Sequence, residues 1–186
     1  MAMPIDINKA IKEASKTFEV KLKKIKVVLF DIDGVLTDGS IFWAGEEFGY
    51  TRVTNIRDGW AMKFLQRHGL KVGVISGGKE PNLFKRFNDT LKLDYVFLGN
   101  EDKREAYKKI LADGFKDEEI MFMGDEFIDL PIMKRVGFSA TVPNSSYEIQ
   151  EIADYISWAR AGEGAAREVM DLIRMAQNLK IDVADF

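Results

Sequence analysis

The sequence predicts an α/β protein built on a Rossmann-like, doubly wound parallel sheet, with a β-hairpin flap after the first strand and no cap domain. Continuous apolar runs of about four residues alternate with segments of helical spacing, which is typical of strands buried in a parallel sheet. The alternation extends along the whole sequence and indicates one doubly wound domain. The apolar runs lie at residues 27–30, 72–75, 95–98, 120–123 and 138–142.

The segment before the first strand predicts a helix that packs on this domain. Apolar residues recur at intervals of three and four over residues 4–22. We therefore expect an N-terminal helical extension at residues 1–23 and a single domain at residues 24–186.

A hairpin and a helix are expected after the first strand. Residues 40–55 alternate partly between apolar and polar around a Gly-Glu-Glu turn, which indicates a β-hairpin. The following helix is expected to run from Asp58, as its N-cap, to Gly69. His68 lies in the last turn of that helix, where the helix dipole favours a cation and a structural role.

The remaining sequence repeats the alternation of strand and helix. Each further apolar run is followed by a segment of helical spacing, as doubly wound folds require. The expected helices lie around 81–92, 102–113, 128–135, after Pro143 and at 164–179, with a short edge strand at 155–156.

The composition is that of an ordinary soluble domain, and it excludes several kinds of site. Apolar residues make up 46% and charged residues 31% of the 186 residues, with a net charge of −3. There is no cysteine, which excludes disulfides, thiolate chemistry and Cys zinc sites, and the single histidine excludes His-cluster metal sites. The sequence has no cluster of basic residues that would indicate nucleic-acid binding. No apolar stretch approaches the ~20 residues that cross a bilayer. Residues 1–26 lack a signal-peptide pattern, so we expect a cytoplasmic protein.

Polar residues that can transfer a phosphoryl group follow four of the expected strands. Asp31 and Asp33 follow the first, Ser76 the second, Lys103 comes shortly after the third, and Asp125 follows the fourth. Ligands of open parallel sheets bind beyond the carboxyl ends of the strands. We therefore expect these residues to meet at one edge of the sheet.

Each of these residue types has a defined task in phosphoryl transfer. Asp31 can attack phosphorus and form an aspartyl-phosphate, and Asp33 can protonate the leaving oxygen and then deprotonate water. Lys103 would neutralise the phosphate and orient the nucleophile. Ser76 and the backbone N–H of Gly77 would bind the phosphate oxygens.

A nucleophilic carboxylate repels a phosphate dianion, so the site needs a cation. Hard oxygen ligands suit Mg²⁺, which prefers octahedral coordination. Asp31, the backbone carbonyl of Asp33 and Asp125 are the expected ligands, and Asp129, one helical turn after Asp125, could hold a metal-bound water. The cation would act by neutralising charge and by templating.

These motifs resemble the haloacid dehalogenase superfamily, and more narrowly its small capless branch, the 3-deoxy-D-manno-octulosonate 8-phosphate phosphatases and their nonulosonate 9-phosphate relatives. The resemblance spans residues 24–176. It is carried by Asp31-Ile-Asp-Gly-Val-Leu-Thr-Asp-Gly39, Ser76, Lys103, Gly124-Asp-Glu-Phe-Ile-Asp-Leu-Pro131 and Gly162-Glu-Gly-Ala-Ala-Arg-Glu168.

The resemblance implies Mg²⁺-dependent hydrolysis of a phosphorylated sugar acid, with the eight-carbon substrate of lipopolysaccharide precursor synthesis preferred over nine-carbon sialic-acid-like substrates. It also implies a homotetramer in which hairpins pack between subunits and a neighbour's C-terminal segment helps to cover the substrate. The interval 33–76, which holds the hairpin and a helix, and the interval between Lys103 and Asp125 are both too short for a separate cap domain of ~50 or more residues. We expect another subunit to cover the hairpin aromatics Phe42, Trp43, Phe48 and Tyr50.

Three positions depart from the pattern of the octulosonate enzymes. Gly78, followed by Lys79, stands where they usually have arginine, Glu126 stands for an aspartate, and Ala161 stands for a glycine. We expect intact hydrolysis, with the identity of the sugar left open. The candidate contacts to a sugar carboxylate or phosphate are Arg57, Lys79, Arg160 and Arg167.

Other classes of protein use some of the same residue types for different functions. A receiver-type phosphoacceptor domain also combines Mg²⁺, aspartate and lysine, but its acceptor follows the third strand, where this chain has Leu98-Gly99-Asn100. A non-catalytic sugar-acid-binding subunit is suggested only by Gly78. A phosphomutase usually needs a cap, and a dehalogenase would not need Asp33.

Overall fold

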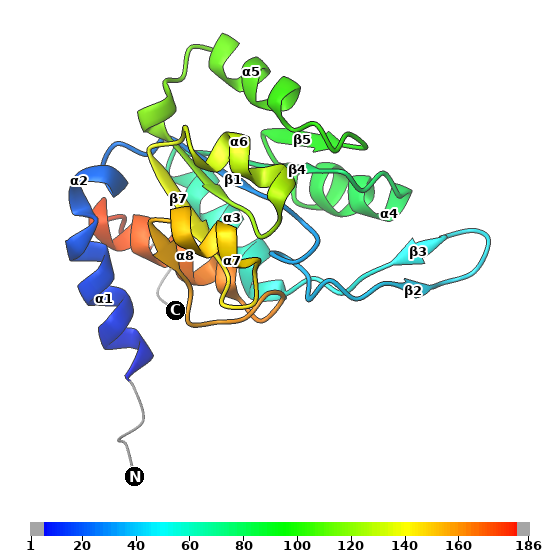
Figure 1. Ribbon diagram of the computed structural model, residues 1–186, viewed down its shortest axis with the longest axis horizontal. Helices are drawn as coiled ribbons and strands as arrows, with labels where there is room; N and C mark the ends of the chain where they lie inside the picture. The colour runs from blue at the N-terminus through cyan, green and yellow to red at the C-terminus, as the bar shows by residue number, and fades with distance from the viewer. Residues whose placement is uncertain (1–5, 182–186) are drawn as a thin grey trace, which may run out of the picture.

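The structure, a computed structural model, describes residues 6–181 and has a six-stranded parallel sheet at its centre (Figure 1). The strand order is β5-β4-β1-β6-β7-β8, so the chain winds outward from β1 in both directions. This confirms the predicted doubly wound sheet. The strands are β1 Val27–Phe30, β4 Lys71–Ser76, β5 Tyr95–Leu98, β6 Ile120–Met123, β7 Phe138–Thr141 and β8 Tyr155–Ile156.

The central strand β1 is completely buried because both of its faces are covered. Val28 and Phe30 pack into the hydrophobic core on one face of the sheet, and Val27 and Leu29 pack into the core on the other. All four side chains have no exposed surface. A strand buried on both faces needs an unbroken apolar run, and this is the pattern that the sequence has here.

Helices cover both faces of the sheet. One core is formed with the helices α1 Ile7–Thr17, α2 Glu19–Leu22, α3 Ile56–Arg67, α4 Pro81–Phe84 with the π-helix Lys85–Thr90, and α8 Ala165–Ala176. The opposite core is formed with α5 Arg104–Ala112, α6 Leu130–Met133 and α7 Tyr147–Ile152, and short 3₁₀ turns lie at Asp117–Glu119 and Phe127–Asp129. None of the helices within residues 6–181 is long and apolar enough to cross a membrane.

The single helix predicted over residues 4–22 is instead two helices, and residues 4 and 5 lie outside the described part. α1 ends at Phe18, whose backbone leaves helical geometry (φ −98°, ψ 12°). The Phe18 ring packs edge-on against Phe138 and Tyr155, so the tertiary contact fixes the break. α1 packs along α8, and the division of the chain at residue 23 stays a prediction.

The predicted N-cap of the helix after the hairpin was wrong. Asn55 caps α3: its backbone is extended and its side chain accepts a hydrogen bond from Arg57 N at 2.9 Å. Asp58 lies inside the first turn of α3, is buried, and accepts a hydrogen bond from Arg167 N in the first turn of α8. Its carboxylate therefore joins two helices that are far apart in sequence.

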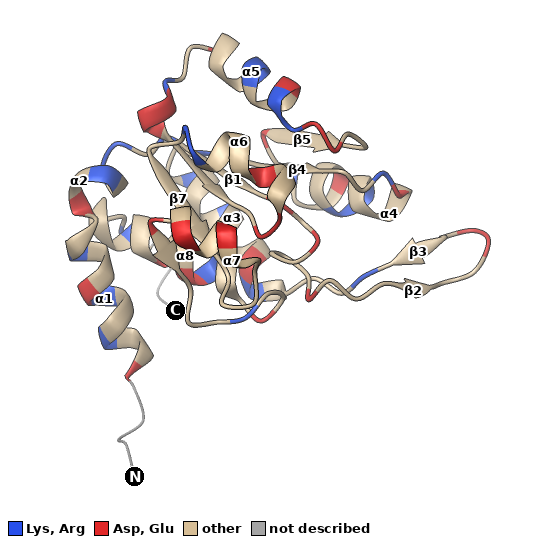
Figure 2. Ribbon diagram, viewed as in Figure 1, with Lys and Arg blue, Asp and Glu red and all other residues tan. Residues whose placement is uncertain are grey.

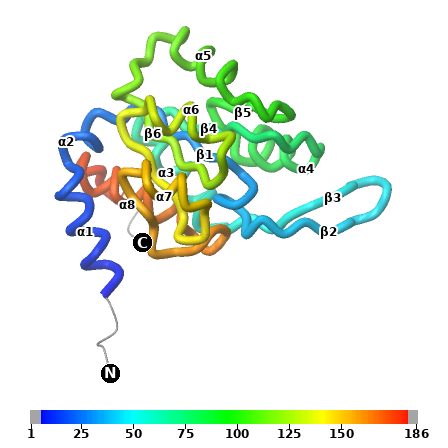
Figure 3. The backbone as a smooth tube through the Cα atoms, viewed as in Figure 1, coloured from blue at the N-terminus to red at the C-terminus, as the bar shows by residue number. Residues whose placement is uncertain are grey.

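The predicted hairpin is present and projects from the body of the molecule. β2 Phe42–Trp43 pairs antiparallel with β3 Tyr50–Thr51, and the tube trace shows this loop extending well beyond the sheet (Figure 3). The side chains of its four aromatic residues are about half exposed, at 50–53%. Between β1 and α3, and between α5 and β6, the described chain forms only this hairpin and a 3₁₀ turn, so neither interval holds a cap domain.

Candidate active site

The nucleophile candidate Asp31 is placed by the end of β1. Its backbone N–H donates to the carbonyl of Met123 on β6 at 2.9 Å, which extends the sheet ladder by one residue. Gly34 then turns the chain at φ +89°, and a Cβ at this position would lie 2.0 Å from Asp125 Oδ2. A glycine is therefore required here both for the left-handed backbone and for the close approach of Asp125.

Lys103 forms ion pairs with two of the aspartates, Asp31 and Asp129. Its Nζ lies 2.7 Å from Asp31 Oδ1 and 2.6 Å from Asp129 Oδ1, and its side chain is fully buried. Burial lowers the pKa of Lys103 while the two carboxylates raise it, and the net shift is upward. Lys103 is thus a fixed positive charge that orients the Asp31 side chain.

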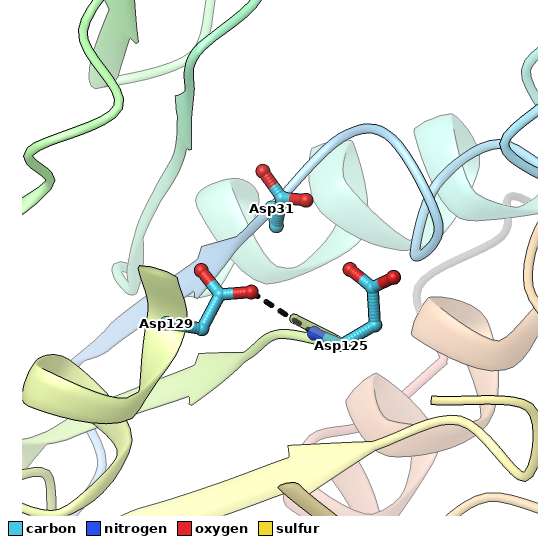
Figure 4. A group of neighbouring side chains, drawn as sticks. All are labelled: Asp31, Asp125 and Asp129. Carbon is cyan, nitrogen blue, oxygen red and sulfur yellow. Dashed lines mark hydrogen bonds between the residues drawn. The ribbon is translucent and has the colours of Figure 1, made fainter. Parts of the chain in front are cut away.

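Asp129 organises the turn that carries Asp125. Its Oδ2 accepts hydrogen bonds from the backbone N–H groups of Asp125 (3.0 Å) and Glu126 (3.2 Å). Figure 4 shows the first of these bonds and the three carboxylates of Asp31, Asp125 and Asp129 gathered around one point. Both Asp129 oxygens are occupied by protein donors, so its predicted role in holding a metal-bound water stays a prediction.

Among the three clustered aspartates, Asp125 is the one whose carboxylate accepts no hydrogen bond from residues 6–181. Its Oδ1 is buried and accepts no hydrogen bond from the described residues. Burial raises the pKa of Asp125, and the charges of Asp31 and Asp129 raise it further. Burial also raises the pKa of Asp31, against the opposing effect of Lys103. The site therefore has an excess of negative charge.

A divalent cation fits this excess. Oxygen atoms of Asp31, Asp125 and Asp129 lie within 4.8 Å of one another, and within the described part of the chain Lys103 is the residue that pairs with them. Three carboxylates and one ammonium leave two negative charges when all are ionised. Carboxylate oxygens are hard ligands of the kind that Mg²⁺ prefers, and the partnerless Asp125 Oδ1 is an available donor atom.

Asp33 is held by a residue that the sequence analysis missed. Arg52, which follows β3 of the hairpin, donates from Nε to Asp33 Oδ1 (2.5 Å) and from Nη2 to Asp33 Oδ2 (2.7 Å). Its Nη1 donates to Glu80 at 3.1 Å. No local pattern marks this arginine, because only the fold of the hairpin brings it back to the first strand.

Ser76 ends β4 at the same edge of the sheet and is buried. Its Oγ accepts a hydrogen bond from Gly78 N at 3.2 Å, which forms a tight turn after the strand. A Cβ on Gly77 would lie 3.1 Å from Glu101 Cγ, so this turn packs closely on the loop after β5. The turn is thus a compact backbone segment beside Asp33 and Arg52.

The four peripheral cations lie outside the aspartate cluster. Arg57, Lys79 and Arg160 are exposed, and Arg167 pairs with Asp171 on α8 at 2.8 Å. Within residues 6–181, none of the four donates a hydrogen bond to the clustered aspartates. Their roles toward a substrate stay predictions.

Comparison with known proteins agrees with this geometry. The family model of haloacid dehalogenase-like hydrolases matches residues 96–169. The 3-deoxy-D-manno-octulosonate 8-phosphate phosphatase KdsC of Yersinia pestis is 35% identical over 83% of this chain and 82% of its own length. KdsC of Escherichia coli K12 is 33% identical over 88% of this chain and 86% of its own.

This chain belongs to the octulosonate 8-phosphate phosphatase family. The predicted resemblance to this branch of the haloacid dehalogenase-like hydrolases, and the predicted enzyme class, a phosphatase, are confirmed. Membership in this family also removes the receiver-type alternative, whose acceptor follows a different strand.

Solved structures of the family superpose on most of this chain. The Moraxella catarrhalis phosphatase, described as a complex with magnesium, phosphate and KDO, has a TM-score of 0.81 and 30% identity over 88% of this chain and 93% of its own. The cobalt-bound Haemophilus influenzae phosphatase has a TM-score of 0.79 and 33% identity over 85% of this chain and 92% of its own. Both neighbours are described with a metal ion bound.

Proposed function

We propose that this protein hydrolyses 3-deoxy-D-manno-octulosonate 8-phosphate in lipopolysaccharide precursor synthesis, through an aspartyl-phosphate on Asp31. The observation that carries the proposal is the buried Asp31–Lys103–Asp129 network beside the partnerless carboxylate of Asp125. The names of the relatives support the choice of substrate.

The reaction takes two displacements. In the first, a carboxylate oxygen of Asp31 bonds to phosphorus, the bond from phosphorus to the sugar oxygen breaks, and Asp33 gives a proton to that oxygen. In the second, water attacks phosphorus and its proton passes to Asp33. The bond from phosphorus to the Asp31 oxygen breaks, which releases phosphate and regenerates the Asp31 carboxylate. Lys103 holds the Asp31 side chain in place throughout, since its Nζ is anchored on the other side by Asp129.

The proposed cofactor is Mg²⁺, held by Asp31, the backbone carbonyl of Asp33 and Asp125, with Asp129 acting through water. When bound, the ion neutralises charge on the phosphoryl oxygens. The buried, partnerless oxygen of Asp125 and the raised pKa of its carboxyl group support this ligand set.

The proposed substrate contacts surround this centre. Ser76 and Gly77, in the turn after β4, would hold the phosphate together with Lys103. The four peripheral cations would bind the sugar carboxylate or phosphate from the rim, namely Arg57, Lys79, Arg160 and Arg167. A nonulosonate 9-phosphate is the second candidate substrate, because Gly78 stands where the octulosonate enzymes usually have an arginine.

We propose a homotetramer in which the hairpin packs between subunits. The exposed aromatic residues of the hairpin support it, because isolated chains seldom expose such a group of apolar side chains. A cytoplasmic location also stays a prediction.

The proposed function is tested by phosphate release from octulosonate 8-phosphate and from a nonulosonate 9-phosphate, with Mg²⁺ and with EDTA. We expect faster release from the eight-carbon substrate, loss with EDTA, and loss in Asp31→Asn. Release by the wild type no faster than by Asp31→Asn on either substrate would favour the sugar-acid-binding subunit. Light scattering of the same sample gives the oligomeric state.

A further inference from the structure

Arg52 is a buried arginine whose contacts lead into the site. It follows β3, where the hairpin returns to the body, and the strand of this hairpin carries a blue segment there in Figure 2. Its side chain is only 6% exposed. Burial lowers the pKa of Arg52 while the carboxylates of Asp33 and Glu80 raise it, and the net shift is upward. A guanidinium buried to this degree needs carboxylate partners, and these two supply them.

The pairing treats the two oxygens of Asp33 differently. Oδ1 accepts from Arg52 Nε and, at 3.4 Å, from Thr37 Oγ1, whereas Oδ2 accepts, within residues 6–181, from Arg52 Nη2 alone. A carboxylate oxygen has two lone pairs. Oδ2 therefore keeps one lone pair that can carry a proton, while two parallel bonds fix the plane of the carboxyl group.

The guanidinium is itself held from two sides. Glu80, in the loop after β4, accepts from Nη1 at 3.1 Å. Gly78 leaves the space that Arg52 occupies: a Cβ at this position would lie 3.3 Å from Arg52 Nη2 and 3.3 Å from Glu80 Oε2. The arginine thus links three segments: the loop after β1, the hairpin and the loop after β4.

We propose that Arg52 is a positioning residue for the acid–base group of this phosphatase: it fixes Asp33 so that Oδ2 exchanges the proton with the leaving sugar oxygen and then with water. The proposal rests on the proposed role of Asp33. In the first displacement the proton passes from Oδ2 to the sugar oxygen as the bond from that oxygen to phosphorus breaks. In the second it returns to Oδ2 from the attacking water. Arg52 itself neither gains nor loses a proton.

A change of leaving group tests this. A sugar alkoxide must be protonated as it leaves, whereas p-nitrophenolate leaves without a proton, so only the first substrate needs a well-placed acid. We expect Arg52→Ala to lower kcat about 10- to 100-fold on octulosonate 8-phosphate, with KM nearly unchanged. On p-nitrophenyl phosphate the first step alone, measured as the single-turnover burst of p-nitrophenolate, should slow less than about 3-fold, because the acid contributes little to that step.

Three further variants sharpen the test. Arg52→Lys keeps the charge but cannot form two parallel bonds, so it should recover little of the lost kcat. Glu80→Gln should shift kcat in the same direction by a smaller factor. The matched control is Arg135→Ala, which removes a 56% exposed arginine that pairs with Asp117 at 2.9 Å. It should leave the activity on both substrates unchanged.

Asp33→Asn separates the two proposals. If Asp33→Asn slows the single-turnover first step equally on both substrates, the proposed role of Asp33 as the acid is wrong. If Asp33→Asn slows the first step mainly on the sugar phosphate, but Arg52→Ala and Arg52→Lys slow it equally on both substrates or mainly raise KM, Arg52 acts on the phosphate or the sugar. The inference is then overturned. Melting temperatures of all variants identify unfolding, and Arg52→Lys serves where Arg52→Ala does not fold.

Discussion

Asp58 in α3 caps α8 from the side: its Oδ1 accepts a hydrogen bond from Arg167 N at 2.8 Å, while its Oδ2 is buried and accepts none from the residues that the structure describes. Burial raises the pKa of Asp58 from its usual 3.8 to about 6, against the opposing effects of the Arg167 N–H and two arginine charges. The link between the two helices is therefore pH-dependent.

The first prediction concerns stability and pH. The folded protein binds the Asp58 proton more tightly than the unfolded chain, so this contribution is present below pH 3.8 and is lost as the pH rises through about 6. Asp58→Asn keeps the acceptor for Arg167 N and removes the titration. We expect it to be more stable than the wild type at pH 7 by up to roughly 3 kcal/mol, with the difference vanishing near pH 4.

Urea unfolding between pH 4 and pH 7 measures this difference. Asp89→Asn changes an exposed aspartate on the π-helix and serves as the control, with an expected difference near zero. A wild type and Asp58→Asn of equal stability at pH 7 would contradict the prediction.

The second prediction concerns the cation site. Without metal, the raised pKa of Asp125 means that stability falls as the pH rises, because the folded protein must give up a proton that it binds tightly. Added Mg²⁺ should raise the melting temperature of the wild type at pH 8. At a Mg²⁺ concentration of 100 Kd, the free energy of unfolding rises by about 2.7 kcal/mol. Asp125→Asn should melt higher than the wild type in EDTA and gain almost nothing from Mg²⁺.

Thermal melts in EDTA and in Mg²⁺ give both values. Glu148→Gln, which removes an exposed carboxylate on α7, should respond to Mg²⁺ as the wild type does. A full Mg²⁺ response in Asp125→Asn would place the cation elsewhere.

The third prediction concerns Gly34. An alanine there combines a positive φ with a Cβ 2.0 Å from Asp125 Oδ2, so Asp125 or the turn after β1 has to move. We expect Gly34→Ala to abolish the Mg²⁺ response and phosphatase activity. Gly39→Ala has a similar φ of +83° with nothing within 4 Å, and should cost only about 1–2 kcal/mol with activity kept. Equal behaviour of the two variants would mean that backbone strain, and not the approach of Asp125, explains the glycine.

The fourth prediction concerns the hairpin. Trp43 packs edge-on against Tyr50 and is still 53% exposed. If the hairpin packs between subunits, Trp43→Glu buries a charge at that contact and should shift the protein from tetramer toward smaller species in light scattering. Val20→Glu, on α2 and 78% exposed, places the same charge outside the hairpin and should leave the mass unchanged. A wild-type monomer would rule out the proposed tetramer.

The sheet could be predicted from the sequence because its central strands, β1, β4, β6 and β7, are buried on both faces. Such strands need unbroken apolar runs, and the residue after each run is carried to the same edge by parallel topology. The approach of Asp31 and Asp125 follows from these two facts, whereas that of Lys103 also depends on the loop that joins β5 to α5. The break at Phe18 could not be predicted, because it depends on rings from β7 and β8.

The contacts of Arg52 and Asp58 were also beyond sequence reasoning. Asp58 has the residue type and local position of an N-cap, and only the packing of α8 on α3 shows that it serves another helix. Arg52 reaches Asp33 because a projecting hairpin folds back at its base. Neither partner is set by periodicity or by spacing, since both depend on how the elements pack in three dimensions.

The buried ammonium of Lys103 constrains how this chain can evolve. It has lost its water and is balanced by Asp31 on one side and Asp129 on the other. Replacing either aspartate alone leaves a poorly compensated charge inside the protein, which costs several kcal/mol. A descendant that abandoned catalysis would therefore have to exchange the lysine together with its carboxylates, and a lineage retaining only one of these residues should be rare.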